Sequence, residues 1–139
     1  MNILSLFLIA FIPIVIGAIY YHPKVVGTRW MKANNFTNED LKGANMIIIL
    51  GVSYLVSLGI TFYLKYNCIN STTCTDGEGQ MCLFFYGLQS GVFLATFIVA
   101  PIIVINALFE RRSITYMLVH IGYWFISLCL MSLIICLTS

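Results

Sequence analysis

Five side chains in the sequence are of types that could do chemistry together: His22, Asn106, Glu110, Tyr116 and His120. Asn106 and Glu110 are four residues apart, and so are Tyr116 and His120, which places each pair on one helical face. Ionisable and strongly polar groups are costly inside a membrane and usually face the protein interior. The pattern suggests a polar pocket that would bind a lipid headgroup, a small metabolite or a metal. The alternative, which we favour, is that these groups form hydrogen bonds between helices, each contributing about 1 kcal/mol.

No motif in the sequence predicts a reaction. Two histidines and one glutamate without an i, i+4 histidine pair are a weak basis for a metal site. Four-helix membrane oxidoreductases use a C-x-x-C pair, and the sequence contains none. We therefore predict no catalytic residue, no metal and no cofactor, and we favour a protein that is not an enzyme.

Charge placement predicts the elements that hold these residues. The seven basic and five acidic side chains of the 139-residue chain fall into three clusters, at residues 24–42, 65–78 and 110–112. The uncharged stretches around them are long enough to cross a hydrocarbon core of roughly 30 Å, which takes about 20 helical residues. With 60% hydrophobic and 9% charged residues, the chain has more apolar surface than a soluble domain of its size can bury. We expect one all-α membrane domain over residues 1–139, a bundle of four helices at about 3–21, 44–64, 81–109 and 114–137. The second helix is expected to begin in the cytoplasm near residue 38.

The distribution of Lys and Arg predicts how the chain is threaded. The loop over residues 22–43 and the turn over residues 110–113 contain all the basic residues except Lys65, which belongs to the loop over residues 65–80. The positive-inside rule places the two basic loops in the cytoplasm. The loop over residues 65–80 and both termini then face the periplasm or the cell exterior. We expect a multi-pass membrane protein with this orientation.

Small residues predict how the helices pack. Gly87, Gly91 and Ala95 repeat at intervals of four, which lets another backbone approach closely. The partner is left open: any of the other three helices, or a second copy of the chain. Ser53 and Ser57 offer a matching small face on the second helix.

Two further local patterns bear on the helices. Pro13 and Pro101 each remove one backbone donor, so we expect bends in the first and third helices. Residues 28–32 have the composition of a short helix lying in the membrane interface, with Trp30 among the headgroups. An irregular loop fits the same residues.

Cysteines gather toward the loop that is predicted to face outward. Cys68 and Cys74 lie in it, and Cys82 and Cys136 are expected near the same surface, with Cys129 deeper. An oxidising compartment would favour a disulfide there. Cys68–Cys74 is the first choice and Cys74–Cys82 the second, although spacing does not fix the connectivity.

Two regions of the sequence carry a resemblance to a family. The first contains Gly17-Ala-Ile-Tyr20-Tyr21-His22-Pro23, then Gly27, Trp30-Met31 and Thr37-x-Glu39-Asp40. The second contains Asn106-x-x-Phe109-Glu110-Arg111-Arg112-Ser113, then Gly122-Tyr123. In order and spacing they resemble the bacterial family called domain of unknown function 1761, over essentially the whole chain. The resemblance implies a small four-helix bacterial protein without an established activity, and the expected location is therefore the cytoplasmic (inner) membrane of a bacterium. Tyr20 stands where the family leads us to expect Trp, and Gln89-Ser90-Gly91 stands near where many members carry His before Gly.

Three functions from different classes fit this sequence. The first is an accessory or scaffold subunit that packs through its helices. The second is an oligomeric transporter or channel for small solutes, although Glu110 lies at the membrane boundary rather than inside it. The third is a lipid- or quinone-binding protein that uses His120 or His22. We favour the first, with the bilayer and another membrane protein or a second copy as partners. A net charge of +2, from basic residues that flank helices, does not indicate nucleic acid.

Overall fold

The computed structural model describes residues 3–35, 45–69 and 79–138, and within these ranges it contains helices but no strand. The elements in chain order are α1 (Ile3–Ile9), α2 (Ile12–Tyr20), the π-helical turn η1 (Pro23–Gly27), α3 (Thr28–Asn34), α5 (Met46–Ile69), α6 (Gly79–Leu94), the π-helical turn η2 (Ala95–Val99), α7 (Ala100–Phe109) and α8 (Ile114–Thr138).

Among the described residues, four helical segments are long and apolar enough to cross a membrane: α1 with α2, α5, α6 through α7, and α8. Their mean hydropathy lies between 2.1 and 2.6, which confirms the predicted all-helical chain with four candidate spans. α5 continues through Lys65 to Ile69, beyond the predicted end at residue 64. A lysine stem can follow an apolar surface while its ammonium group reaches water, so the helix does not stop at the charge. The expected helix start near residue 38 lies outside the described residues.

Pro13 and Pro101 each interrupt the candidate membrane span in which they lie. α1 ends at Ile9, four residues before Pro13, because the Pro13 nitrogen has no hydrogen to donate to the Ile9 carbonyl. Pro101 is the second residue of α7, just after η2, and this π-helical turn absorbs the break in the hydrogen-bond ladder. The first and third spans are therefore segmented rather than straight.

The short helix expected at residues 28–32 is present as part of α3. The chain reaches it through a tight turn after α2, in which Gly27 donates its N–H to the His22 carbonyl at 3.1 Å. A Cβ at Gly27 would overlap the carbonyl oxygen of Tyr21, so no larger residue fits this turn. α3 ends at Asn34, and the next residue, Asn35, has a φ of 57°, the left-handed conformation common after helices.

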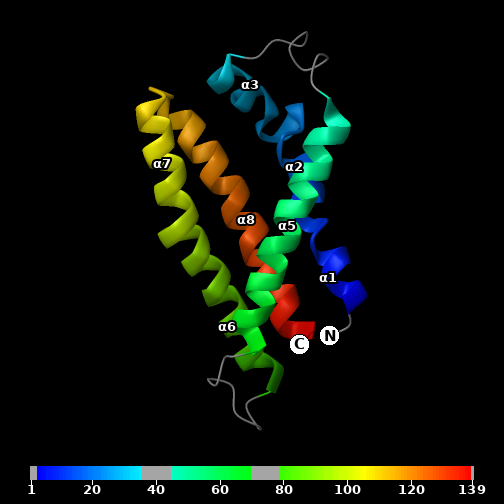
Figure 1. Cartoon of the computed structure of the whole chain (residues 1–139). Helices are drawn as coiled ribbons and strands as arrows, with labels where there is room; N and C mark the ends of the chain where they lie inside the picture. Colours follow the sequence, from blue (N-terminus) through cyan, green and yellow to red (C-terminus); the bar gives the residue numbers. More distant parts are fainter. Residues whose placement is uncertain (1–2, 36–44, 70–78, 139) are drawn as a thin grey trace.

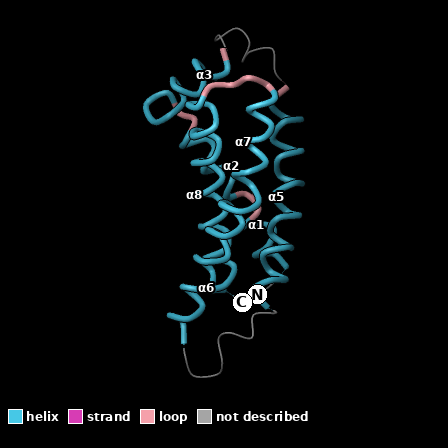
Figure 2. Tube along the Cα trace, turned by 90° about the vertical axis from the view of Figure 1, so that its left-hand side faces the viewer, coloured by secondary structure: helices cyan, strands magenta, loops and turns pink. Residues whose placement is uncertain are grey.

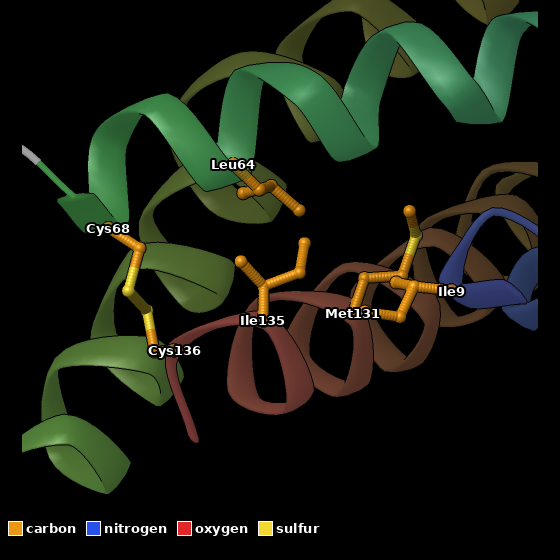
Figure 3. Packing of buried hydrophobic residues seen from close by; sticks show 6 residues of the cluster. All are labelled: Ile9, Leu64, Cys68, Met131, Ile135 and Cys136. Atoms are coloured by element: carbon orange, nitrogen blue, oxygen red, sulfur yellow. A yellow bond between two sulfur atoms is a disulfide. The ribbon is translucent and has the colours of Figure 1, made fainter. Parts of the chain in front are cut away.

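α8 is the central helix of the bundle. It contacts every other helix over the described residues, and α6 packs on it most extensively. A cluster of buried apolar residues surrounds its last turns, where Met131 and Ile135 meet Ile9 of α1 and Leu64 of α5 (Figure 3). The three other spans are therefore arranged around α8.

Close packing of α6 on α8 uses the predicted small residues. A Cβ at Gly91 would lie 2.7 Å from the Cα of Cys129, and one at Gly87 would lie 3.0 Å from the Cα of Leu133. Ala95, the third residue of the pattern, is buried as well. The helix that these residues approach is therefore α8, the last of the chain.

The serines of α5 do not match the small face of α6. Ser57 is buried and its carbonyl accepts a hydrogen bond from the Thr61 hydroxyl at 2.8 Å, whereas Ser53 is exposed. α5 contacts α8 much more than it contacts α6, because α6 already occupies its small face with α8. Of the two serines expected to offer a small face, Ser57 lies inside the bundle and Ser53 on its surface.

A disulfide joins Cys68, in the last turns of α5, to Cys136, near the end of α8 (Figure 3). Their Cα atoms are 5.6 Å apart, and both residues belong to the buried cluster. The first-choice pair, Cys68–Cys74, is therefore wrong. Sequence proximity favoured Cys74, but helix packing brings Cys136 to Cys68. The second choice, Cys74–Cys82, includes a residue outside those described, and Cys129 is a free thiol.

The bundle has two ends of different chemistry (Figures 1 and 2). At the disulfide end α1 begins, α5 ends, α6 begins and α8 ends. At the basic end lie α3 and the turn between α7 and α8, with the described residues Lys24, Arg29, Lys32, Arg111 and Arg112. Both ends of the described chain are thus at the disulfide end.

Candidate functional site

Aromatic side chains from three helices surround His120 near the basic end. This aromatic cluster consists of Tyr20 and Tyr21 from the end of α2 and the residue after it, Trp30 of α3, and Tyr116, His120 and Tyr123 of α8. The spacing of four and three residues places the α8 members on one helical face, as the sequence suggested. α2 presents its two tyrosines to that face.

Two glycines give the rings room to enter the interface between α2 and α8. A Cβ at Gly17 of α2 would lie 3.5 Å from the ring of Tyr123 on α8. A Cβ at Gly122 of α8 would lie 2.6 Å from the hydroxyl of Tyr20 on α2. Each helix therefore contributes one tyrosine and one glycine to a reciprocal contact. The Tyr123 hydroxyl also donates to the Pro13 carbonyl at 2.9 Å.

His120 connects α8 to the chain just after α2. Its Nδ1 lies 3.4 Å from the Tyr21 hydroxyl, and its ring centroid lies 4.3 Å from that of Tyr116. Burial, with a smaller effect of neighbouring Tyr123, raises the pKa of the Tyr21 phenol well above its ordinary value. Tyr21 therefore stays a neutral hydroxyl in this contact. The Nε2 atom of His120 is buried and has no hydrogen-bond partner among the described residues.

Three of the five predicted pocket residues lie outside this cluster. Asn106 is exposed on α7, because the neighbouring Ala107, 1% exposed, faces the bundle instead. Glu110 is exposed and accepts a hydrogen bond from Nε of Arg112 at 3.1 Å. His22 is also exposed, and its Nδ1 accepts from the backbone N–H of Lys24 at 3.3 Å. Of the five predicted pocket residues, the structure brings together Tyr116 and His120. The Arg112 guanidinium lies over the Tyr116 ring, 5.5 Å from its centroid.

The sequence reasoning left out the two tyrosines at the end of the first span, of which Tyr21 contacts His120 and Tyr20 contacts Tyr21 and Tyr123. Tyr20 and Tyr21 were interpreted only as aromatic residues of a membrane boundary. A clue to their role is present in the sequence. Gly17 and Tyr20 belong to the first region of family resemblance, and Gly122 and Tyr123 belong to the second. Spacing within each helix does not show that a tyrosine of one helix packs against a glycine of the other.

The arrangement around His120 favours connection of helices over catalysis. Hydroxyl and imidazole groups can exchange a hydrogen bond, but no described carboxylate or thiol is hydrogen-bonded to His120. Within residues 3–35, 45–69 and 79–138, no three or more His, Cys, Asp or Glu side chains form a group that could hold a metal ion. The chemistry that the cluster offers is a hydrogen bond inside a shell of aromatic rings.

A double-mutant cycle tests this connecting role. His120→Ala is expected to lower the free energy of unfolding in detergent by about 1 to 2 kcal/mol, because it removes a hydrogen bond and a ring contact. After Tyr21→Phe the same change should cost about 0.6 kcal/mol less, since the hydrogen bond is already lost. Asn106→Ala, which changes an exposed side chain, is the control and should leave stability unchanged. Equal losses of unfolding free energy from Asn106→Ala and His120→Ala would contradict the claim that His120 connects helices and Asn106 does not.

Comparison with known proteins identifies a family. The family model described as protein of unknown function, DUF1761, matches residues 4–136, which confirms the resemblance suggested by the sequence. Neither curated proteins nor solved structures give a match.

Proposed function

The chain belongs to the DUF1761 family of proteins of unknown function, and from this premise we propose that it acts as an accessory membrane subunit. It binds another membrane protein, or a second copy of itself, through its helices. The observation that carries this proposal is the outward face of α5. Gly51 and Gly59 on that face have no atom within 4 Å of an added Cβ, and Leu55 between them is 67% exposed.

The outer face of α5 contrasts with the small-residue face of α6. α5 packs on the bundle through Ser57, Thr61 and Leu64, which leaves its glycines on the other side uncovered. Small residues on a membrane helix let a second backbone approach closely, and this packing drives association in lipid. Because α8 already covers the glycines of α6, α5 is the better surface for a partner.

The proposed orientation places the basic end in the cytoplasm. Five described basic residues lie at that end: Lys24, Arg29, Lys32, Arg111 and Arg112. The Cys68–Cys136 disulfide lies at the other end, where an oxidising compartment would maintain it. Charge and thiol chemistry thus support the same threading, with both ends of the described chain outside and the protein in the inner membrane.

Association is tested by enlarging one glycine of α5. Gly59→Leu is expected to reduce co-purification of a second tagged copy, or of a partner identified in the wild-type preparation, by about tenfold in mild detergent. A Cβ at Gly59 has open space around it, with no packed atom within 4 Å, so the stability of the monomer should be unchanged. Ala18→Leu enlarges an exposed small residue on α2 and is the matched control. A wild-type protein that is strictly monomeric and carries no partner would overturn the proposal, as would unchanged association of Gly59→Leu.

A further inference from the structure

We propose that a groove between α5 and α6, near the disulfide end, binds the head of an uncharged membrane lipid by hydrogen bonds. The groove has a volume of about 380 Å³, within the range of ligand sites in proteins. α5 and α6 each pack on α8 but contact each other much less, which leaves the groove between them. The Tyr86 hydroxyl bridges the two helices by donating to the Asn67 carbonyl at 3.3 Å. This site is independent of the accessory role and of the α5 glycines.

Polar groups without partners line this groove at membrane depth. Gln89 is exposed on α6, about 15 Å along the helix from Gly79, and its side chain makes no hydrogen bond to a described residue. Ser90 and Tyr63 add hydroxyl groups to the same lining. A polar side chain inside a bilayer is costly unless it finds a partner. Gln89 therefore needs an occupant that supplies hydrogen-bonding atoms.

The lining is amphipathic along the direction of the helix. Moving inward along α6, Tyr86, Gln89 and Ser90 come first, and Phe93 and Leu94 follow. Phe93 is 56% exposed and Tyr63 is 50% exposed, so the groove is open along the side of the bundle. A lipid would enter from the bilayer, with its head against the polar part and its chain along the apolar part. This order matches a molecule whose polar end points toward the disulfide end.

The absence of charge in the groove lining indicates which kind of lipid headgroup it can bind. No lining residue is charged, so nothing there neutralises a phosphate. The amide and hydroxyl groups both donate and accept hydrogen bonds, which suits carbonyl and hydroxyl oxygens. Diacylglycerol carries both, and a quinone carries carbonyls. Their shared chemistry is a neutral oxygen-bearing head on an apolar tail.

Photo-crosslinking of the full chain in phosphatidylcholine nanodiscs tests this proposal. The probes are a diazirine-bearing diacylglycerol, a diazirine-bearing quinone, and an anionic phosphatidylglycerol analogue. We expect saturable labelling of α5 or α6 at the groove by at least one neutral probe. Comparing the labelling yields of the diacylglycerol and quinone probes shows which of these two lipids binds. Gln89→Leu should weaken that labelling about fivefold, the loss of one to two hydrogen bonds in a membrane.

A matched variant separates the groove from general lipid contact. Asn106→Leu makes the same amide-to-leucine change at an exposed position of α7, outside the groove, and should label like the wild type. Both variants must retain the wild-type elution profile and unfolding temperature for the comparison to count as support. Non-saturable labelling, equal labelling of the two variants, or preference for the anionic probe would overturn the proposal.

Discussion

Replacing Gly91 with leucine is expected to lower the free energy of unfolding by about 3 kcal/mol or more. At this position a Cβ alone would lie 2.7 Å from the Cα of Cys129 and 2.8 Å from the Leu128 carbonyl oxygen. Both are backbone atoms, which cannot rotate away as a flexible side chain can. Leucine must therefore push α6 away from α8, and the loss of contact extends along the most extensive helix pair of the bundle. Thermal unfolding in detergent, followed by size-exclusion chromatography, measures the effect.

The control for Gly91 is Gly59→Leu, the same change on α5. No atom lies within 4 Å of a Cβ at Gly59, so the unfolding temperature of the monomer should not fall. Gly91→Ala should give an intermediate loss of about 1 to 2 kcal/mol, because its single methyl group already meets backbone. Equal unfolding temperatures for Gly91→Leu and Gly59→Leu would show that α6 and α8 are not in the close contact described.

Helix number and length follow from the sequence because they depend on local properties. An uncharged stretch must satisfy its backbone hydrogen bonds within itself in lipid, so hydrophobic length predicts a helix directly. Pro13 and Pro101 likewise act on their own helices, and both breaks lie where the missing donor requires them. The close approach of Gly87 and Gly91 to another helix was also predictable. Its partner was not, since three helices offered comparable apolar surfaces.

Rotation about the helix axis explains why the predicted pocket is not assembled. Asn106 and His120 lie on adjacent antiparallel helices at similar depth, but depth does not determine which way a side chain faces. The π-helical turn η2 changes the register of the helix before α7, and Ala107 rather than Asn106 faces the bundle. His120 instead meets Tyr21, from a helix far away in the sequence. Sequence spacing shows which residues share a face of one helix. Which faces of two helices meet depends on how the helices pack.

The two regions of family resemblance contact each other in space. Gly17 and Tyr20 of the first region meet Tyr123 and Gly122 of the second. These residues therefore serve the junction of α2 with α8, and a structural role accounts for them without a reaction. The Nε2 atom of His120 also lacks a partner in the described chain, but it is buried, whereas Gln89 is exposed in the groove between α5 and α6. Ligand binding and helix connection are thus assigned to opposite ends of the bundle.

Loss of the Cys68–Cys136 disulfide is expected to lower stability by about 2 to 4 kcal/mol. The bond joins positions 68 residues apart and ties the end of α5 to the end of α8 inside the buried cluster. The upper value applies to a freely unfolded chain. Helices that remain inserted in detergent restrict the unfolded state, so the loss of stability is then smaller. Cys68→Ser and Cys136→Ser should show equal losses of unfolding temperature, and the double variant should show no more, because each change removes the same bond. Cys129→Ser changes a free thiol and is the control.

The same bond reports which end of the bundle faces outward. A membrane-impermeant reductant added to intact cells should break Cys68–Cys136, because the disulfide end is proposed to lie outside. Maleimide labelling after denaturation, located by peptide mass spectrometry, should then appear on Cys68 and Cys136, which separates their reduction from that of Cys82, also disulfide-bonded. Reduction that requires opened membranes would reverse the proposed threading while leaving the bond itself in place. Additive losses in Cys68→Ser and Cys136→Ser would instead contradict the bond, because two independent thiols would then contribute separately.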